Sequence, residues 1–191
     1  MSGLVLETPR LILRPFTTRD AGDLLRFAGD PRVALPAGWE PPRSFMESWL
    51  MVQTVFMQPD VFALELKETG RVIGSVALTG GHPAGELPDC PDDEAAFALD
   101  PEYWGQGVTA EAMDALERWA FTQLGLHRLW CVHYAGNWRC GRFAAKRGYR
   151  YRFARTTEVD QLRQARQTYF YMLTEEEWRE RVHRALCGYG E

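Results

Sequence analysis

A glycine-rich turn between an expected strand and an expected helix carries the strongest chemical signal in the sequence. The strand is Glu94–Leu99, the turn reads Trp104-Gly105-Gln106-Gly107-Val108-Thr109, and the helix continues to Leu124. Such a turn directs several backbone N–H groups, at the positive end of the helix dipole, toward one point, and a nest of this kind binds phosphate. Gly105 and Gly107 have no Cβ, so the main chain can approach an anion closely.

Other interpretations of this turn differ in what they require of the surrounding sequence. A glycine turn can join a strand to a helix with no ligand at all. Gly105 to Ala110 matches the dinucleotide pattern G-x-G-x-x-A, but that fold places the glycine directly after its strand and an acid about 20 residues later. Here a spacer with Pro101 intervenes, and the next expected strand, Leu126–His133, has no acid. The Walker pattern G-x-x-x-x-G-K-[ST] is absent, which disfavours a nucleotide triphosphatase.

The elements that must position this turn follow an order typical of one mixed-sheet α/β domain. Apolar periodicity, turn residues and capping residues predict helices over Ala21–Ala28, from Ser44 to Pro59, over Asn137–Arg147, and from the capping box at Thr174. The same signals predict strands over Leu4–Phe16, Val61–Lys67, Arg71–Thr79, Glu94–Leu99, His127–His133, Tyr149–Arg155 and Thr168–Leu173. Two stretches rich in Pro and Gly are expected to be loops, Ala34–Pro42 and Gly80–Asp93.

The order of these elements resembles that of the GCN5-related N-acetyltransferase (GNAT) superfamily: a strand, the glycine turn, a long helix, a strand and a short helix that begins with Asn137. The turn motif of that superfamily, Q/R-x-x-G-x-G/A, binds the pyrophosphate of coenzyme A. Trp104 to Thr109 occupy its six positions, with Trp104 and Thr109 as departures. The run Tyr103-Trp104-Gly105-Gln106-Gly107 is similar to the RimJ/RimL branch, which acetylates protein N-termini.

Two further segments resemble the same branch. Leu6–Pro15 is similar to its opening strand. Asn137-Trp138-Arg139-Cys140-Gly141-Arg142, closed by Arg147-Gly148-Tyr149, is similar to its N-x-x-S-x-R…G-F motif, with Cys140 in place of the serine and Tyr149 in place of the phenylalanine. The resemblance covers Leu6 to Leu173, in the right order.

The resemblance implies a GNAT-like fold, a strongly twisted mixed sheet of about six or seven strands flanked by helices. The expected domain spans residues 1–191, with its core at 6–173 and a C-terminal helix at 175–186. The implied function is an acetyl-CoA-dependent N-acetyltransferase acting on a primary amine, either a protein N-terminus or a small-molecule amine, by direct attack in a ternary complex. A non-catalytic acyl-CoA-binding module is the alternative, because the position of a tyrosine acid used in other branches falls at Ala144.

The resemblance also implies where acetyl-CoA binds. The pantetheine arm is expected to pair with the backbone of Phe97, Ala98 and Leu99, as an added strand would. Asn137 would orient the thioester or a pantetheine amide, and Arg142 would meet a phosphate or else be a solvated helix charge. The expected cofactor-binding residues are Phe97, Ala98, Leu99, Trp104, Gly105, Gln106, Gly107, Val108, Thr109, Asn137 and Arg142.

Two residues are candidates for proton transfer. Glu94, at the start of its strand, is the expected base acting through water, unless it is only a surface carboxylate beside Asp92 and Asp93. An α-amino acceptor, with a pKa near 7.7–8.0, is partly neutral without any base. A thiol, with a reference pKa of ~8.5, is a better proton donor than a serine hydroxyl. Cys140 is therefore the expected acid for the departing thiolate, unless it merely fills a small-residue position.

The amine is expected to enter between the two predicted loops. Trp39 would form one wall of its site. The acidic residues Glu86, Asp89, Asp92 and Asp93 would attract a cation or else form a solvated loop.

Composition excludes several other classes of protein. The charged fraction of 25% is ordinary for a globular protein, and the net charge of −4 argues against sequence-independent binding of nucleic acid. No apolar run approaches the ~20 residues of a membrane span, and the absence of a basic leader predicts a cytoplasmic location. The four cysteines and four histidines lack metal-ligand spacing, so no metal is expected. The chain is expected to be a monomer or a homodimer.

Overall fold

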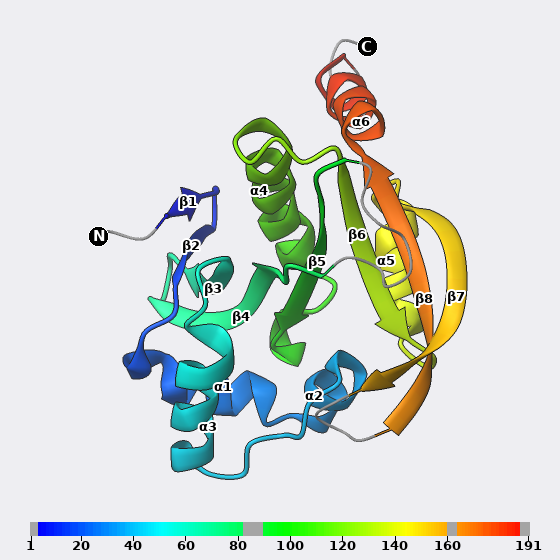
Figure 1. Ribbon diagram of the computed structural model, residues 1–191. Coiled ribbons are helices and arrows are strands. Elements are labelled where there is room, and N and C mark those ends of the chain that lie inside the picture. The colour runs from blue at the N-terminus through cyan, green and yellow to red at the C-terminus, as the bar shows by residue number, and fades with distance from the viewer. Residues whose placement is uncertain (1–3, 82–89, 160–163, 188–191) are drawn as a thin grey trace.

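One mixed sheet runs through the molecule, as a computed structural model of residues 4–81, 90–159 and 164–187 shows (Figure 1). Its eight strands lie in the order β1-β2-β3-β4-β5-β6-β8-β7. Only β5 and β6 are parallel, and every other neighbouring pair is antiparallel. The strands are β1 (Leu6–Glu7), β2 (Leu11–Pro15), β3 (Val61–Leu66), β4 (Arg71–Leu78), β5 (Asp92–Leu99), β6 (Arg128–Tyr134), β7 (Arg150–Val159) and β8 (Gln164–Thr174).

The expected mixed α/β sheet is confirmed, with one strand more than the six or seven predicted. The extra strand arises because the chain turns back on itself where a single strand over Leu4–Phe16 was predicted. The Thr8 N–H donates to the Leu11 carbonyl at 3.0 Å, and the Thr8 hydroxyl accepts from the Leu11 N–H at 2.9 Å. Leu6 therefore pairs with Leu13 in a short hairpin.

The helices cover both faces of the sheet. On one face, called here the α4 face, lie α4 (Val108–Thr122) and α5 (Trp138–Lys146). On the opposite face, the α1 face, lie α1 (Ala21–Ala28), α3 (Phe45–Met51) and the π-helical turn η2 (Val52–Phe56). The remaining helical segments are the 3-10 turns η1 (Thr18–Asp20) and η3 (Pro101–Tyr103), the short α2 (Pro31–Ala37) and the terminal α6 (Glu175–Cys187).

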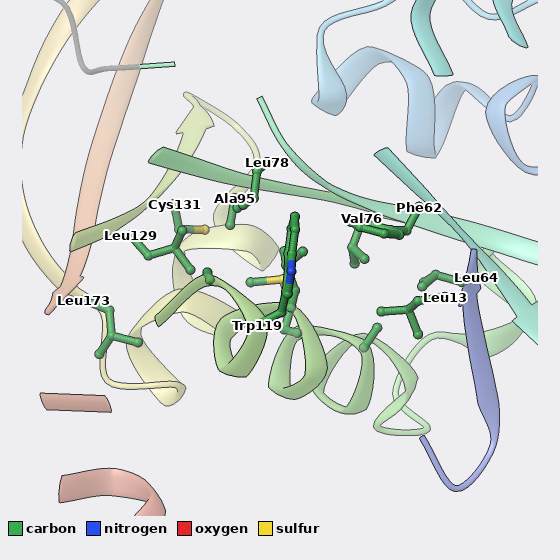
Figure 2. Close-up of a cluster of buried hydrophobic side chains, with 14 of the residues drawn as sticks. Leu13, Phe62, Leu64, Val76, Leu78, Ala95, Trp119, Leu129, Cys131 and Leu173 are labelled. Atoms are coloured by element: carbon green, nitrogen blue, oxygen red, sulfur yellow. The ribbon is translucent and has the colours of Figure 1, made fainter. Parts of the chain in front are cut away.

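Each face has its own apolar core. Figure 2 shows the larger core, in which Trp119 of α4 packs between Phe62 and Leu129 of the sheet. Ala95 and Leu99 of β5 belong to this core, whereas Ala98 belongs to the core under α1. Because strand side chains alternate between faces, the even-numbered residues of β5, Glu94 included, point to the α1 face.

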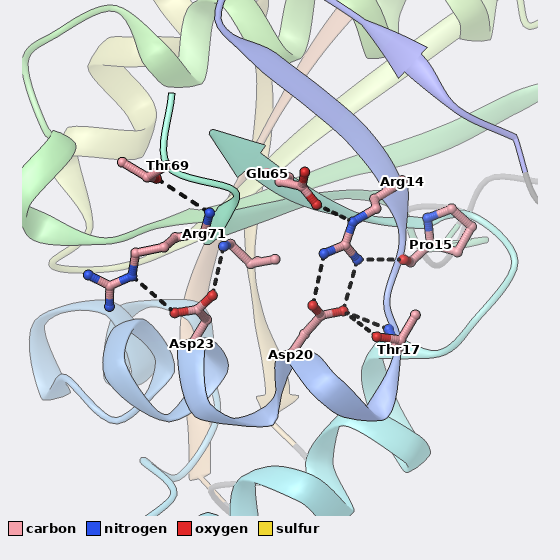
Figure 3. Close-up of polar contacts among 9 residues, drawn as sticks. Arg14, Pro15, Thr17, Asp20, Asp23, Glu65, Thr69 and Arg71 are labelled. Atoms are coloured by element: carbon pink, nitrogen blue, oxygen red, sulfur yellow. Dashed lines mark hydrogen bonds and ion pairs between the residues drawn. The ribbon is translucent and has the colours of Figure 1, made fainter. Parts of the chain in front are cut away.

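A partly buried ion pair joins β2 to η1, the turn that precedes α1. The Arg14 guanidinium donates two hydrogen bonds of 2.9 Å to Asp20 and one of 2.6 Å to Glu65 (Figure 3). Asp20 also accepts from the Thr17 N–H at 2.7 Å, at the start of η1. These contacts hold the pKa of Asp20 below its usual range despite its burial. The segment that resembles an opening strand thus holds α1 against the sheet.

The predicted loop over Ala34–Pro42 is wrong in its first half, because α2 extends to Ala37. Pro31 occupies the first turn, where a missing N–H costs nothing, and the Asp30 side chain caps the helix by accepting from Arg32 N–H at 2.8 Å. Gly38 ends it with a left-handed φ of 91°. The helix packs against β5 and β6.

A buried carboxylate links three helices beside the sheet. Glu117 of α4 is fully buried and accepts hydrogen bonds from Arg147, from the Tyr149 hydroxyl at 3.1 Å and from Arg181 of α6. Arg147 also donates to the Ala110 carbonyl at 3.2 Å. The tyrosine at 149, which departs from the branch motif, supplies a donor that phenylalanine lacks. This network holds the end of α5 against α4.

Close helix–strand approach makes Gly141 sensitive to substitution. A Cβ at Gly141 would lie 2.7 Å from His133 Nε2, and the His133 ring is stacked on Tyr169 and Tyr171. We expect Gly141→Ala to lower the free energy of unfolding by roughly 1–3 kcal/mol. Gly22, in α1, is the control: a Cβ there meets nothing within 4 Å, so Gly22→Ala should stabilise by roughly 0.5–1 kcal/mol. Urea unfolding measures both, and a Gly141→Ala protein as stable as wild type would contradict the close contact.

Candidate active site

The two parallel strands separate part-way along their length. The β5–β6 ladder runs from Asp92 and Arg128 to Ala95 and Cys131 and then stops, although β5 continues to Leu99 and β6 to Tyr134. Both strands keep their other neighbours: β4 pairs with β5 as far as Leu99, and β8 pairs with β6 as far as Tyr134. We call the opening between 96–99 and 132–134 the β5–β6 gap.

Backbone groups without ladder partners line this gap. The Glu94 carbonyl accepts from Thr79 N–H and the Asp100 N–H donates to Ile73, both on the β4 side. Backbone polar groups alternate along a strand, so those of Phe97 and Leu99 point into the gap. The Leu99 carbonyl accepts from the Trp104 indole N–H at 2.8 Å, which leaves Phe97 as the residue presenting both groups.

The glycine turn lies at the end of β5, as the sequence predicts. Gly105 and Gly107 both have a φ of +76°, the left-handed conformation that glycine adopts without strain. Gly107 is the N-cap of α4, and its carbonyl accepts from the Glu111 N–H. The N–H groups of the first turn of α4, from Val108 on, therefore have no intrahelical partner. The expected anion nest has the required backbone geometry.

Two arginines that the sequence did not single out lie beside this turn. Arg10, in the β1–β2 turn, donates to the Gln106 carbonyl at 3.0 Å and pairs with Glu111 at 2.6 Å. The Arg139 guanidinium lies 4.1 Å from the centre of the Trp104 ring. Trp104, the departure at the first motif position, thus holds a cation near the turn where the usual motif has a polar or cationic side chain.

Glu94 lies on the α1 face at the last part of the β5–β6 ladder, where it pairs with Trp130. Its side chain is partly buried, and its carboxylate has no hydrogen bond or ion pair within the ranges that the structure describes. Burial, together with the charge of Asp93, raises the pKa of Glu94 to about 7. A carboxyl group with this pKa can accept a proton near neutral pH.

Cys140 approaches the gap from the α4 face. It is buried on α5, with its Sγ 3.8 Å from Cys131 Sγ and 3.9 Å from the Val132 carbonyl oxygen. The Ala135 N–H donates to Gln167 on the β8 side, so by alternation the backbone groups of Val132 point toward the gap. Contact with Cys140 and complete burial raise the pKa of the Cys131 thiol well above its usual value. Cys131 therefore remains a neutral thiol.

Comparison with known proteins gives the family. Residues 10–150 match the family described as "Acetyltransferase (GNAT) domain", a range of about three quarters of the chain. The chain belongs to the GNAT acetyltransferase family. A relative from Bacillus subtilis, "Uncharacterized N-acetyltransferase YoaA", is 27% identical over 153 residues, which are 76% of this chain and 82% of that protein.

Solved structures agree with the GNAT fold. A GCN5-related N-acetyltransferase from Brucella melitensis has a TM-score of 0.79 at 20% identity, covering 93% of this chain and 81% of that one. A candidate ribosomal-protein-serine acetyltransferase from Vibrio cholerae has a TM-score of 0.75 at 20% identity, covering 91% of this chain and 99% of that one. At this identity the likeness shows the fold.

The remaining GNAT-motif residues have contacts of their own. Asn137 caps α5, accepting from the Cys140 N–H at 3.3 Å, and its amide N–H donates to the Pro36 carbonyl of α2 at 3.4 Å. Arg142 is exposed and forms no ion pair within the described part of the chain. Trp39 is partly buried against Phe56, with ring centres 6.0 Å apart.

The predicted acceptor entrance is only partly described. Residues 82–89 of the expected loop Gly80–Asp93, with Glu86 and Asp89, lie outside the described residues. Asp92 and Asp93 belong to β5 instead of the loop, because the ladder with β6 begins at Asp92. Asp92 accepts from the Trp130 indole N–H at 2.9 Å, and Asp93 from the Gly80 N–H at 2.8 Å.

Among the residues that the structure describes, no helix is long and apolar enough to cross a membrane. The His, Cys, Asp and Glu side chains of these residues form no group of three that could hold a metal ion.

Proposed function

We propose that this GNAT protein is an acetyl-CoA-dependent N-acetyltransferase that moves the acetyl group from the thioester to a primary amine by direct attack in a ternary complex. The observation that carries the proposal is the β5–β6 gap, with the glycine turn at one end and a carboxyl group of pKa about 7 beside it. The acceptor is a protein N-terminus or a small-molecule amine. The Tyr-Trp-Gly-Gln-Gly run and the likeness to the Vibrio cholerae protein favour a RimJ/RimL-like acceptor.

The backbone of the gap fits the amide-containing arm of coenzyme A. Phe97 presents an N–H and a carbonyl, and strand-like pairing with the arm would satisfy both. The free N–H groups from Val108 on would hold the pyrophosphate, with Gly105 and Gly107 allowing close approach. Arg10 and Arg139, together with Arg142, would supply positive charge. Ala98, Leu99, Trp104, Gln106, Thr109 and Asn137 complete the proposed set.

Positioning supplies much of the rate. Holding a thioester and an amine at attack distance can contribute on the order of 7–11 kcal/mol. The amine nitrogen forms a bond to the carbonyl carbon, the C–S bond breaks, and the amine must lose a proton. Glu94 would take that proton, directly or through water, on the α1 face. Trp39 would form a wall on that face.

Cys140 would return a proton to the departing sulfur from the α4 face. We expect Cys140→Ala to lower kcat by roughly 10²–10⁴ with little change in acetyl-CoA affinity. Cys140→Ser keeps an O–H donor near the Val132 carbonyl and should retain more activity than the alanine variant. Steady-state kinetics and melting temperatures of both variants measure this.

The neighbouring thiol is the control for Cys140. Cys131→Ala removes a neighbouring buried sulfur of the larger apolar core, and it should change the melting temperature with little change in kcat. A Cys140→Ala variant with near-native kcat, or a serine variant less active than alanine, would remove Cys140 from the mechanism.

A non-catalytic acyl-CoA-binding module is the competing proposal. Release of free coenzyme A in the presence of a panel of amines separates the two: an enzyme releases thiol in proportion to acceptor, whereas a module binds acetyl-CoA without turnover. A parallel titration with NAD tests the dinucleotide interpretation of the glycine turn, and the proposed function predicts no saturable binding.

A further inference from the structure

Arg155, on the α1 face of the sheet that Glu94 shares, has no hydrogen-bond partner among the residues that the structure describes. Arg155 of β7 pairs with Thr168 of β8, and Phe153 pairs with Phe170, so these four side chains share one face. Phe170 is in turn opposite Val132, which lines the β5–β6 gap. Phe170, Phe153 and Val132 pack together with Trp130, which neighbours Glu94.

The Arg155 guanidinium lies close to two aromatic rings of this apolar surface. Its guanidinium carbon is 4.9 Å from the centre of the Phe170 ring and 5.8 Å from that of Phe153. Its Nε is buried and has no hydrogen-bond partner. No carboxylate in the described ranges pairs with it.

Two other arginines at this end of the α1 face, Arg166 and Arg128, have polar partners. Arg166 donates to the Leu35 carbonyl at 3.0 Å and to Gln164 at 3.1 Å. Arg128 lies 3.7 Å from Asp92. Arg155, unlike Arg128, has no carboxylate partner among the described residues, and its buried Nε has no hydrogen-bond partner there, which is costly unless an acceptor arrives.

The geometry points to Arg155 as the residue that binds a carboxylate of the acceptor, which rests on the proposed N-acetyltransferase function. A guanidinium held on aromatic rings is already oriented, and its planar donors match a carboxylate in a bidentate pair. Neighbouring strands lie about 4.8 Å apart, so a group over Phe170 is one to two strand spacings, roughly 5–10 Å, from the gap. The acceptor class is therefore an amine whose carboxylate lies roughly 5–10 Å from the reacting nitrogen.

Short peptides test this spacing, because an extended chain advances at most about 3.3–3.6 Å per residue. Alanine peptides of increasing length are compared as free acids and as C-terminal amides, beside ω-amino acids and the matching alkylamines. We expect wild type to favour the free acid by roughly 10–100-fold in kcat/KM, with the largest preference at two or three residues. Arg155→Met should abolish the preference by slowing only the acids, and Arg155→Lys should keep part of it.

Arg152, exposed on the same strand, is the matched control, and Arg152→Met should keep the full preference. Melting temperature and acetyl-CoA affinity should stay near wild type in all variants. Two results would overturn the role of Arg155 and leave the proposed function intact. In the first, the enzyme acetylates amines with no preference for the carboxylate in any pair. In the second, the preference for the carboxylate survives Arg155→Met. Absence of acetylation with every amine, despite acetyl-CoA binding, overturns the proposed function itself.

Discussion

Replacing Glu94 with glutamine should lower kcat by roughly 10²–10⁴ while acetyl-CoA affinity stays close to wild type. Glutamine has the same shape but cannot accept the amine proton. Because the pKa of Glu94 is about 7, the wild-type rate should rise as pH increases through 7 and then level off. An acceptor amine of low pKa, such as an aromatic amine or an acyl hydrazide, keeps the acceptor's own titration out of this range.

Asp93 provides the matched control for this pH dependence. Its charge contributes to the raised pKa of Glu94, so Asp93→Asn should move the acid limb of the rate profile to lower pH with only a small loss of maximal rate. An Asp93→Asn profile that coincides with wild type would contradict the assignment of the limb to Glu94. A Glu94→Gln variant with near-native kcat would show that the acceptor loses its proton without this base.

As pH increases through the titration of Glu94, the free energy of unfolding should fall while the catalytic rate rises. A carboxyl group whose pKa rises from an ordinary 4.5 to about 7 on folding makes the folded state less stable as pH increases between these values. Glu94→Gln removes that cost, so at about pH 8 it should be more stable than wild type by roughly 1–3 kcal/mol, and at about pH 4 similar to it. Denaturant unfolding at the two pH values gives the comparison.

Introducing aspartate at Gly107 should weaken acetyl-CoA binding by roughly 100-fold or more. The new carboxylate would occupy the proposed pyrophosphate nest, and juxtaposed like charges cost several kcal/mol. A Cβ at this position would lie 3.7 Å from Arg10 Nη2, so the carboxylate would also pair with a cation that the phosphate needs.

Gly125 separates this effect from backbone strain. Gly107 and Gly125 both have left-handed φ values, +76° and +66°, and Gly125 lies beyond the other end of α4. Gly125→Asp should therefore lower the melting temperature about as much as Gly107→Asp, while acetyl-CoA affinity, measured by calorimetry, remains native. Equal losses of affinity in both variants, or survival of binding in Gly107→Asp, would place the phosphates elsewhere.

Local signals predicted most of the fold. The apolar periodicity of α4, the turn glycines and the capping box at Thr174 depend on neighbouring residues, and the structure confirms each: Thr174 and Glu177 exchange hydrogen bonds of 3.0 and 3.2 Å. Ala34–Ala37 was predicted as loop because it contains Pro36, yet the Asp30 cap and Pro31 begin a short helix there. The presence of a proline therefore excludes a helix of two turns less reliably than it excludes a long one.

The backbone geometry of the candidate site could be predicted where it depends on one continuous segment. The left-handed Gly105 and Gly107 follow from the turn itself. Arg10 reaches the same turn from more than 90 residues away, through Gln106 and Glu111, and periodicity carries no sign of such a contact. The sequence could have indicated Arg139, because it lies one helical turn before Arg142 and so shares a face of α5 with it. The opening of β5 from β6 depends on pairing between distant strands, and only the structure reveals it.

Transfer of a labelled acetyl group from acetyl-CoA to an amine is the decisive test of the proposed N-acetyltransferase function. The protein is incubated with acetyl-CoA carrying an isotopic label in the acetyl group and with the amine panel, and the products are separated and identified by mass spectrometry. We expect an N-acetylated amine that carries the label, formed in equal amount to free coenzyme A and lost in Glu94→Gln. Labelled acetyl-CoA that binds but remains intact, or that yields only labelled acetate, with every amine would contradict the proposed function.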